Sequence, residues 1–129
     1  MVQNKAKILL IEDDMFMRRL YSDVFTLEGF DFTTAENGEE GLLQIYKETP
    51  ALILLDIMMP NMNGLEVLEK LKIDPRTKNI PVVMLTNLSG KTEENNAMQK
   101  GATKYLVKSE YEPKQIVNIV KEILAKPTH

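Results

Sequence analysis

Five short apolar segments alternate along this chain with five segments in which apolar residues recur at helical spacing. An apolar run that stops at polar residues is typical of a strand buried on both faces, whereas recurrence every three or four residues is typical of an amphipathic helix. The expected strands are Lys7–Ile11, Phe30–Ala35, Ala51–Leu55, Val82–Leu85 and Lys104–Val107. Because strands that alternate with helices are joined in parallel by crossovers, the pattern predicts a doubly wound α/β domain with a five-stranded parallel sheet and five helices.

The helical segments differ in how much apolar surface they offer. The last one carries Ile116 and Val120 on one face, as a helix packed on a sheet does. The segment Lys91–Lys100 is mostly polar, and Ala97 and Met98 are its clear apolar pair. We therefore expect this fourth helix to be weakly buried.

Length and composition exclude several classes of protein. The 129 residues amount to slightly less than one typical domain of about 150, which excludes a two-domain enzyme. The net charge of -3 and the scattered basic residues disfavour direct binding of nucleic acid. The absence of cysteine excludes disulfides, thiolate zinc sites and thiol catalysis. Apolar runs such as Ile8–Ile11 are too short to insert into a membrane, and Met1–Lys7 lacks a secretion signal, so we expect a cytoplasmic protein.

Polar side chains follow four of the expected strands at the point where each strand ends. Glu12 and Asp13 follow the first, Asp56 the third, Thr86 the fourth and Lys108 the fifth. In an open parallel sheet, ligands bind in the crevice outside the carboxyl ends of the strands. The sequence therefore predicts that these side chains converge on one site.

Three carboxylates in one pocket require a positive partner. Two unit charges about 4 Å apart repel by roughly 4 kcal/mol at an effective dielectric constant of 20, and Lys108 neutralises only one charge. Oxygen ligands without histidine or cysteine favour a hard divalent cation, and few protein ligands suit Mg²⁺ better than Ca²⁺. A metal, an ammonium and a hydroxyl around one carboxylate would also surround a phosphoryl group, so we expect an aspartyl phosphate.

Each of these residues also has an ordinary structural interpretation. An acidic cluster after a strand is most often a turn or a helix cap, and we expect Asp14 to be the cap. The side chains of Met58, Met59 and Met62 are expected to pack in a loop rather than bind metal, and His129 is expected to lie in a tail. The joint placement at successive strand ends favours a site over these separate interpretations.

Four motifs resemble the receiver domain of two-component response regulators, the family that includes the bacterial chemotaxis regulator. The most specific is Asp56–Gly64, which looks like the phosphoacceptor loop, and the others are Ile11–Asp14, Leu85–Thr86 and Tyr105–Lys108. The resemblance extends from Lys7 to about Lys126. It implies a flavodoxin-like fold with strand order 2-1-3-4-5, a receiver domain over residues 5–126 and a tail over residues 127–129.

The resemblance implies a phosphorylation site. Asp56 would be the nucleophile that takes a phosphoryl group from a phosphohistidine on a sensor histidine kinase or phosphotransfer protein. Mg²⁺ would be held by Asp13, Asp56 and the backbone carbonyl of Met58, with Glu12 acting through water. Lys108 would pair with the carboxylate and then with the phosphoryl oxygens.

The resemblance also implies a switch. Thr86 would donate its hydroxyl to the phosphoryl group, while Tyr105 would move from an exposed to a buried rotamer. Residues Lys91–Lys100, Lys104–Val107 and the final helix would form the output face for a partner, or for a phosphorylation-dependent homodimer. Such a domain is not an enzyme and assists only its own phosphorylation and dephosphorylation.

Two positions depart from the family pattern. Ser109 replaces the usual proline after the lysine, where the family often has a cis peptide bond, and a non-proline cis bond costs about 2.5 to 4 kcal/mol. Asn87 stands where the family often has a smaller residue, and we hypothesise that it alters water access to the phosphoryl group.

Two other functions remain open at the level of sequence, and a third is excluded. A phosphatase of the haloacid dehalogenase type also uses an aspartate nucleophile and Mg²⁺, but Glu12-Asp13-Asp14 lacks its Asp-x-Asp spacing. A receiver-like scaffold that is never phosphorylated is disfavoured by the intact acceptor set. A flavin-binding relative would need a phosphate-binding loop where this chain has acids.

Overall fold

Five strands and five α-helices alternate in the computed structural model, which describes residues 5–126. The expected tail at residues 127–129 lies outside this range, as does His129. The strands are β1 (Lys7–Ile11), β2 (Asp31–Ala35), β3 (Leu52–Leu55), β4 (Val82–Thr86) and β5 (Lys104–Val107). The helices are α1 (Met15–Leu27), α2 (Gly38–Lys47), α3 (Gly64–Ile73), α4 (Lys91–Gln99) and α5 (Pro113–Ala125), with a single 3₁₀ turn η1 (Lys108–Glu110) before α5.

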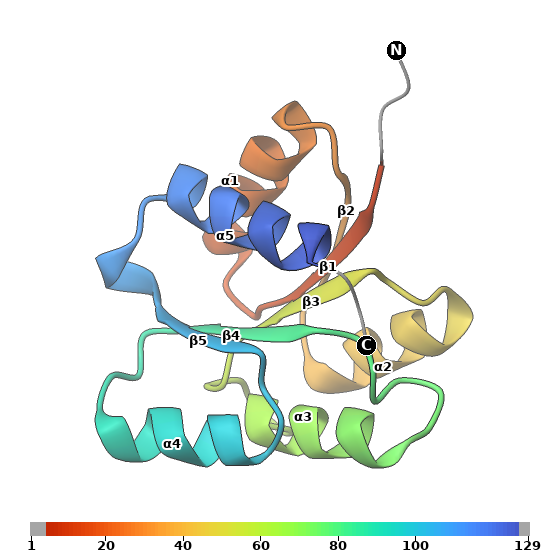
Figure 1. The fold of residues 1–129 in the computed structure, drawn as a ribbon, viewed down its shortest axis with the longest axis vertical. Helices are drawn as coiled ribbons and strands as arrows, with labels where there is room; N and C mark the ends of the chain where they lie inside the picture. The colour runs from red at the N-terminus through yellow and green to blue at the C-terminus, as the bar shows by residue number, and fades with distance from the viewer. Residues whose placement is uncertain (1–4, 127–129) are drawn as a thin grey trace.

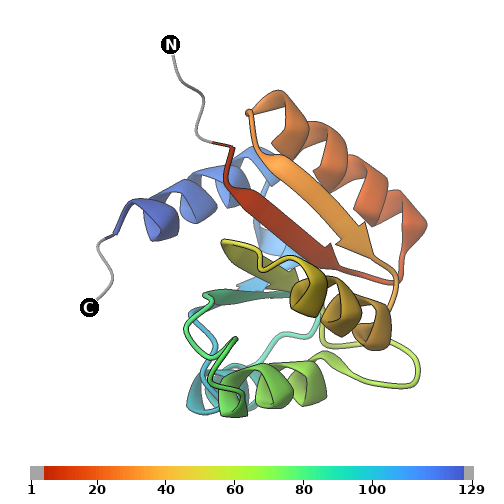
Figure 2. The ribbon, with the colours of Figure 1, turned by 90° about the vertical axis from the view of Figure 1, so that its right-hand side faces the viewer.

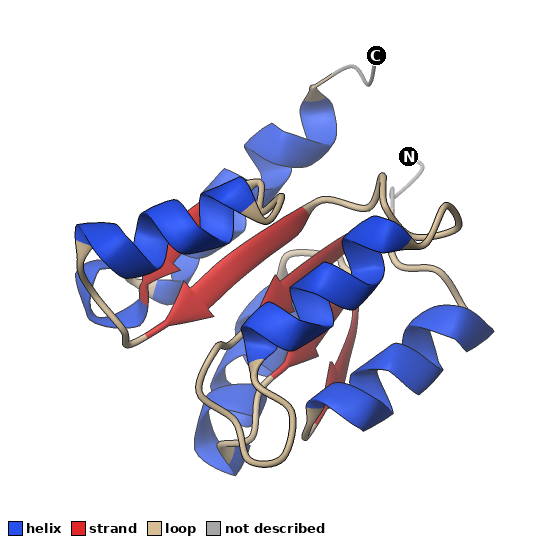
Figure 3. Cartoon of the chain, turned by 90° about the horizontal axis from the view of Figure 1, so that it is seen from below, coloured by secondary structure: helices blue, strands red, loops and turns tan. Residues whose placement is uncertain are grey.

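The strands form one parallel sheet in the order β2-β1-β3-β4-β5, which confirms the predicted doubly wound, flavodoxin-like topology. Helices α1 and α5 lie on one side of the sheet, and α3 and α4 lie on the other (Figure 1). The view turned by 90° shows the same layers with α2 on the side of α3 (Figure 2). Because the strands are parallel, their arrowheads point toward one edge of the molecule, where the loops that carry the candidate site lie (Figure 3).

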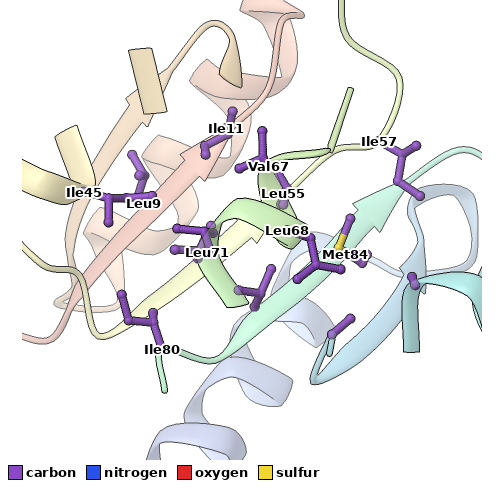
Figure 4. Packing of buried hydrophobic residues seen from close by; sticks show 14 of the residues in the cluster. Leu9, Ile11, Ile45, Leu55, Ile57, Val67, Leu68, Leu71, Ile80 and Met84 are labelled. Carbon is purple, nitrogen blue, oxygen red and sulfur yellow. The ribbon is translucent and has the colours of Figure 1, made fainter. Parts of the chain in front are cut away.

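The sheet separates two apolar cores, and alternate residues of each central strand point into each core. In β1, Ile8 and Leu10 face α1 and α5, whereas Leu9 and Ile11 face the α2, α3 and α4 side. Both faces are covered, so the strands read as continuous apolar runs in the sequence. Figure 4 shows the core on the α2, α3 and α4 side of the sheet. There the residues of β1 and β3 pack against those of α3, including Val67, Leu68 and Leu71.

The second strand starts one residue later than the sequence predicts. Gly29 has a φ of +93°, and its amide donates to the Thr26 carbonyl. The amide of Phe30 then donates to the Phe25 carbonyl at 3.2 Å. This amide closes the end of α1 and is therefore not available for a hydrogen bond to a neighbouring strand. The ladder therefore begins at Asp31, paired with Lys7.

The weak burial expected of the fourth helix is confirmed. Ala97 is the buried residue of α4, while Met98 is 41% exposed. The N-cap position of α4 is Gly90, which has a φ of +125° and supplies no side-chain cap. In the described residues, no helix combines the length and apolar character needed to cross a membrane.

Candidate functional site

The strand ends bring the predicted site residues together. Glu12 follows β1, Asp56 follows β3, Thr86 ends β4 and Lys108 follows β5. They line one pocket of about 250 Å³, together with Asp13, Asp14, Met58 and Asn87. Side chains that are far apart in the sequence therefore share a cavity at the carboxyl edge of the sheet, where ligands of this fold class bind.

Three carboxylates form the acidic part of the pocket. Glu12, Asp13 and Asp56 each place one oxygen within 4.8 Å of the other two. Glu12 and Asp56 are buried, at 1% and 5% exposure, whereas Asp13 is exposed at the mouth of the pocket. Charges at this separation repel strongly, and more so where burial reduces screening by solvent.

Lys108 is the cation placed among these carboxylates. Its Nζ donates to Glu12 Oε1 at 2.5 Å and to Asp56 Oδ2 at 3.4 Å. Burial by itself lowers the pKa of Lys108, but the hydrogen bond to Glu12 and the two nearby negative charges more than offset this, so the pKa is raised overall. The ammonium therefore stays charged and balances one of the three carboxylates.

Glu12 lacks sufficient positive charge around it. Burial raises the pKa of Glu12 to about 7, and the charge of Asp56 adds to the rise, while the hydrogen bond from Lys108 opposes it. Its second oxygen, Oε2, accepts from the backbone amide of Asp14 at 3.1 Å. The cluster therefore holds a proton near neutral pH when no other cation is supplied.

The chemistry of the donor set fits a hard cation. Asp56 Oδ1 is buried and has no hydrogen-bond partner within residues 5–126. A buried oxygen without a donor is costly, and it faces a pocket that two further carboxylates line. Oxygen ligands of this kind suit Mg²⁺, which keeps several waters and needs few protein ligands. The acidic cluster can bind a metal ion.

Thr86 and Tyr105 meet at one residue, Leu88. The hydroxyl of Thr86, whose side chain is fully buried, accepts from the Leu88 amide at 3.2 Å. The Tyr105 hydroxyl donates to the Leu88 carbonyl at 2.8 Å. Tyr105 does not line the acidic pocket and is half-buried, and burial together with Glu93 and Glu94 raises its pKa. Nothing in the sequence indicated that Leu88 links these two side chains, because Leu88 contacts both through its backbone atoms.

The loop after β3 folds back onto the backbone of Asp56. The Gly64 amide donates to the Ile57 carbonyl at 2.8 Å, and a Cβ at Gly64 would lie 2.0 Å from the Asp56 carbonyl oxygen. Asn61 takes a φ of +72° within the loop, and Asn63 caps α3. Only glycine allows this close approach, so the last residue of the predicted phosphoacceptor motif is needed for the shape of the loop.

Several smaller expectations are decided at the edges of the pocket. Asp14 is the N-cap of α1 and accepts from the Phe16 amide at 2.8 Å, as predicted. Met59 is buried in the core and Met62 packs against it, in line with the packing expected of this loop, but the expectation is wrong for Met58, which lines the pocket and is 61% exposed. The bond before Ser109 is trans, like every described peptide bond, and it lies in η1.

Comparison with known proteins decides which family this geometry represents. The model of the response regulator receiver domain matches residues 8–121. The chain belongs to the response regulator receiver domain family. This match confirms the resemblance that the motifs indicated. Receiver domains are signalling domains of two-component systems and not classical enzymes.

Individual relatives agree with this family. The probable transcriptional regulator ycf27 of Pyropia yezoensis is 34% identical over 98% of this chain, but this chain spans only 50% of that relative. Among solved structures, the chemotaxis protein CheY4 of Vibrio cholerae has a TM-score of 0.86 and 27% identity, over 93% of this chain and 99% of that one. CheY in the CheX–CheY–BeF₃–Mg²⁺ complex of Borrelia burgdorferi has a TM-score of 0.85 and 27% identity, over 94% and 90%.

Proposed function

We propose that this receiver domain accepts a phosphoryl group on Asp56 with the help of Mg²⁺. The observation that carries the proposal is Asp56 Oδ1, a buried carboxylate oxygen without a partner among residues 5–126, in a pocket that also holds two carboxylates and one ammonium. The proposed domain covers residues 5–126, and its role in two-component signalling favours a cytoplasmic location.

The proposed reaction is transfer from a phosphohistidine on a sensor histidine kinase or phosphotransfer protein. A carboxylate oxygen of Asp56 attacks phosphorus, so that an O–P bond forms and the P–N bond to the imidazole breaks. The electron pair returns to the imidazole nitrogen, which takes a proton from solvent. The Lys108 ammonium, already 3.4 Å from Asp56 Oδ2, then pairs with the phosphoryl oxygens.

A bound Mg²⁺ would supply positive charge that offsets the negative charge of the carboxylates and the phosphoryl group. The proposed ligands are Asp13, Asp56 and the backbone carbonyl of Met58, with Glu12 acting through water. The clustering of the three carboxylates within 4.8 Å supports this assignment. So does the similarity to the Borrelia burgdorferi CheY, which was solved in a complex with BeF₃ and Mg²⁺.

The proposed switch acts through Leu88. A Thr86 hydroxyl that turns toward a phosphoryl oxygen changes its contact with the Leu88 amide, and Tyr105 is bonded to the carbonyl of the same residue. Phosphorylation would thereby bias the packing of Tyr105 and of the face formed by α4, β5 and α5. An output partner, or a second copy in a phosphorylation-dependent homodimer, would read that face.

Intact-mass spectrometry after incubation with acetyl phosphate and MgCl₂ tests the proposal. We expect one labile phosphate on the wild type and none on Asp56→Asn or on the wild type in excess EDTA. Asp23→Asn is the matched control, because it makes the same substitution at an exposed residue of α1 that does not line the pocket. Equal labelling of Asp56→Asn would overturn the proposal, and turnover of phosphoester substrates would favour the phosphatase instead.

A further inference from the structure

We infer that Arg18, on the first turns of α1, is a positioning residue that holds the acidic loop in the shape needed to bind a cation. Its guanidinium Nη1 donates to the Glu12 carbonyl at 2.9 Å and to the Asp13 carbonyl at 2.9 Å. These are consecutive carbonyls of the two residues that supply carboxylates from β1. The inference rests on the proposed function, because it concerns the same cation site.

One nitrogen that binds two consecutive carbonyls fixes the peptide planes between them. The direction in which the Glu12 and Asp13 side chains leave the backbone depends on these planes. Arg18 is half-buried, so its side chain is partly held by neighbours rather than free in solvent. A residue that touches neither the pocket nor its ligand atoms can therefore set the separation of two carboxylates.

The other polar groups of the loop after β1 form hydrogen bonds with partners other than Arg18 or with its backbone. The Glu12 amide donates to the Ala35 carbonyl at 3.0 Å, and the Asp14 amide donates to Glu12 Oε2 at 3.1 Å. The Asp14 side chain caps α1, and the Asp14 carbonyl accepts from the Arg18 amide at 3.0 Å. The carboxylate of Asp13, by contrast, accepts no hydrogen bond from residues 5–126. Together with these hydrogen bonds, the contacts of Arg18 fix the loop and leave the Asp13 carboxylate free to bind a cation at the pocket mouth.

Positioning and charge have opposite effects on cation binding, which makes the inference testable. The positive guanidinium repels a cation, so removing its charge alone would tighten binding. Removing the two hydrogen bonds loosens the loop and weakens binding. Replacing outer-shell partners of metal ligands commonly weakens affinity by about tenfold or more, so we expect the positioning effect to exceed the charge effect.

The matched control is the next residue in the chain. Arg19 carries the same charge on the same helix, but it is exposed, and its side chain makes no hydrogen bond or ion pair with the described part of the chain. Arg18→Gln and Arg19→Gln therefore remove the same charge, and only the first removes the contacts with the loop. Arg18→Lys keeps the charge and donors that reach a carbonyl, so it should restore part of the lost affinity.

The experiment is a MgCl₂ titration of each variant. Binding is monitored by the NMR chemical shifts of the backbone amides of Asp13 and Asp56. We expect the dissociation constant to rise roughly tenfold in Arg18→Gln, to recover partly in Arg18→Lys and to stay within twofold of wild type in Arg19→Gln. With acetyl phosphate, the half-saturating MgCl₂ concentration should rise in Arg18→Gln, while the phosphorylation rate at saturating MgCl₂ stays near that of wild type. A general loss of structure would instead also lower the phosphorylation rate at saturating MgCl₂.

Failure of this inference differs from failure of the proposed function. If the wild type binds Mg²⁺, Asp13→Asn weakens binding and Arg18→Gln behaves like Arg19→Gln, then only the role of Arg18 is overturned. Tighter binding in Arg18→Gln would show that its charge alone matters and would also overturn the inference. If the wild type binds no Mg²⁺, or Asp13→Asn binds it as well as wild type, the proposed function and this inference both fail.

Discussion

Glu12 and Asp56 share one ammonium, and this shortage of positive charge has a consequence for pH dependence. The pKa of Glu12 is raised from 4.5 to about 7, mainly by burial. Between these values the folded protein keeps a proton that the unfolded chain has lost. The contribution of Glu12 to the free energy of unfolding is therefore largest at low pH and falls as the pH rises through about 7.

We predict that Glu12→Gln removes this dependence in metal-free protein, because the amide is neutral at every pH. From pH 5 to 7, the wild type should lose stability relative to Glu12→Gln by about 1.4 kcal/mol per pH unit at most. Urea unfolding in EDTA at several pH values measures the difference between the two proteins. A difference that does not change with pH would contradict the prediction, and saturating MgCl₂ should abolish the dependence.

Asn87 lines the acidic pocket directly after Thr86, as its position in the sequence suggested. If its amide controls how water reaches the phosphoryl group, Asn87→Ala should change the rate of dephosphorylation severalfold with little effect on stability. Loss of labelled phosphate after removal of acetyl phosphate measures this rate. Equal rates in the wild type and Asn87→Ala would dismiss the hypothesis.

The sequence was sufficient to find the side chains that line the pocket but not those that arrange it. Glu12, Asp56 and Lys108 directly follow apolar runs, so strand ends and parallel topology were enough to bring them together. Arg18 and Leu88 act through backbone carbonyls and amides, whose partners depend on loop conformation rather than on residue type. No periodicity in the sequence signals such contacts.

At the scale of elements, the loop between β3 and α3 depends on Gly64. An added Cβ would meet the backbone oxygen of Asp56 at 2.0 Å, and backbone atoms cannot move away without disturbing the proposed phosphoacceptor. We predict that Gly64→Ala lowers the free energy of unfolding by roughly 1 to 3 kcal/mol and slows phosphorylation. Chemical denaturation and labelling with acetyl phosphate measure the two effects.

Gly38 provides the comparison, because a Cβ there would meet the side chains of Val67 and Met62 rather than backbone. Side chains adjust more easily, so Gly38→Ala should cost less stability than Gly64→Ala and leave phosphorylation intact. The reverse order of effects would contradict the explanation. The sequence showed Gly64 as part of a motif, but the clash that requires glycine appears only when the loop is folded.

Element types were predictable and element ends were less so. The apolar runs predicted all five strands, whereas the start of β2 shifted because the Phe30 amide closes the end of α1. Gly29 marked the end of that helix, but nothing in the sequence showed how many amides the turn would use. The N-cap at Asp14 was predictable because the aspartate side chain itself accepts a hydrogen bond from a free amide at the start of the helix.

For the whole molecule, the carboxylate cluster links cation binding to folding. A ligand that binds only the folded state stabilises it by mass action, by about 1.4 kcal/mol at ten times its dissociation constant. We predict that MgCl₂ at this excess raises the Tm by roughly 5 °C and that Asp13→Asn removes most of the rise. Thermal unfolding with and without MgCl₂, at constant ionic strength set with KCl, checks this. An equal rise in both proteins would indicate a nonspecific salt effect.

Helix α4 buries one alanine, and this affects how quickly the molecule can change shape. Losing the burial of a single methyl group costs only about 0.8 kcal/mol, so little apolar contact opposes displacement of this helix. By contrast, α5 buries Ile116, Val117 and Val120. Backbone amides of α4 should therefore exchange with deuterium sooner than those of α5. The face formed by α4, β5 and α5 would thus combine a helix that is readily displaced, α4, with one that is fixed, α5. The affinity of a partner that contacts both helices would then depend on their relative displacement.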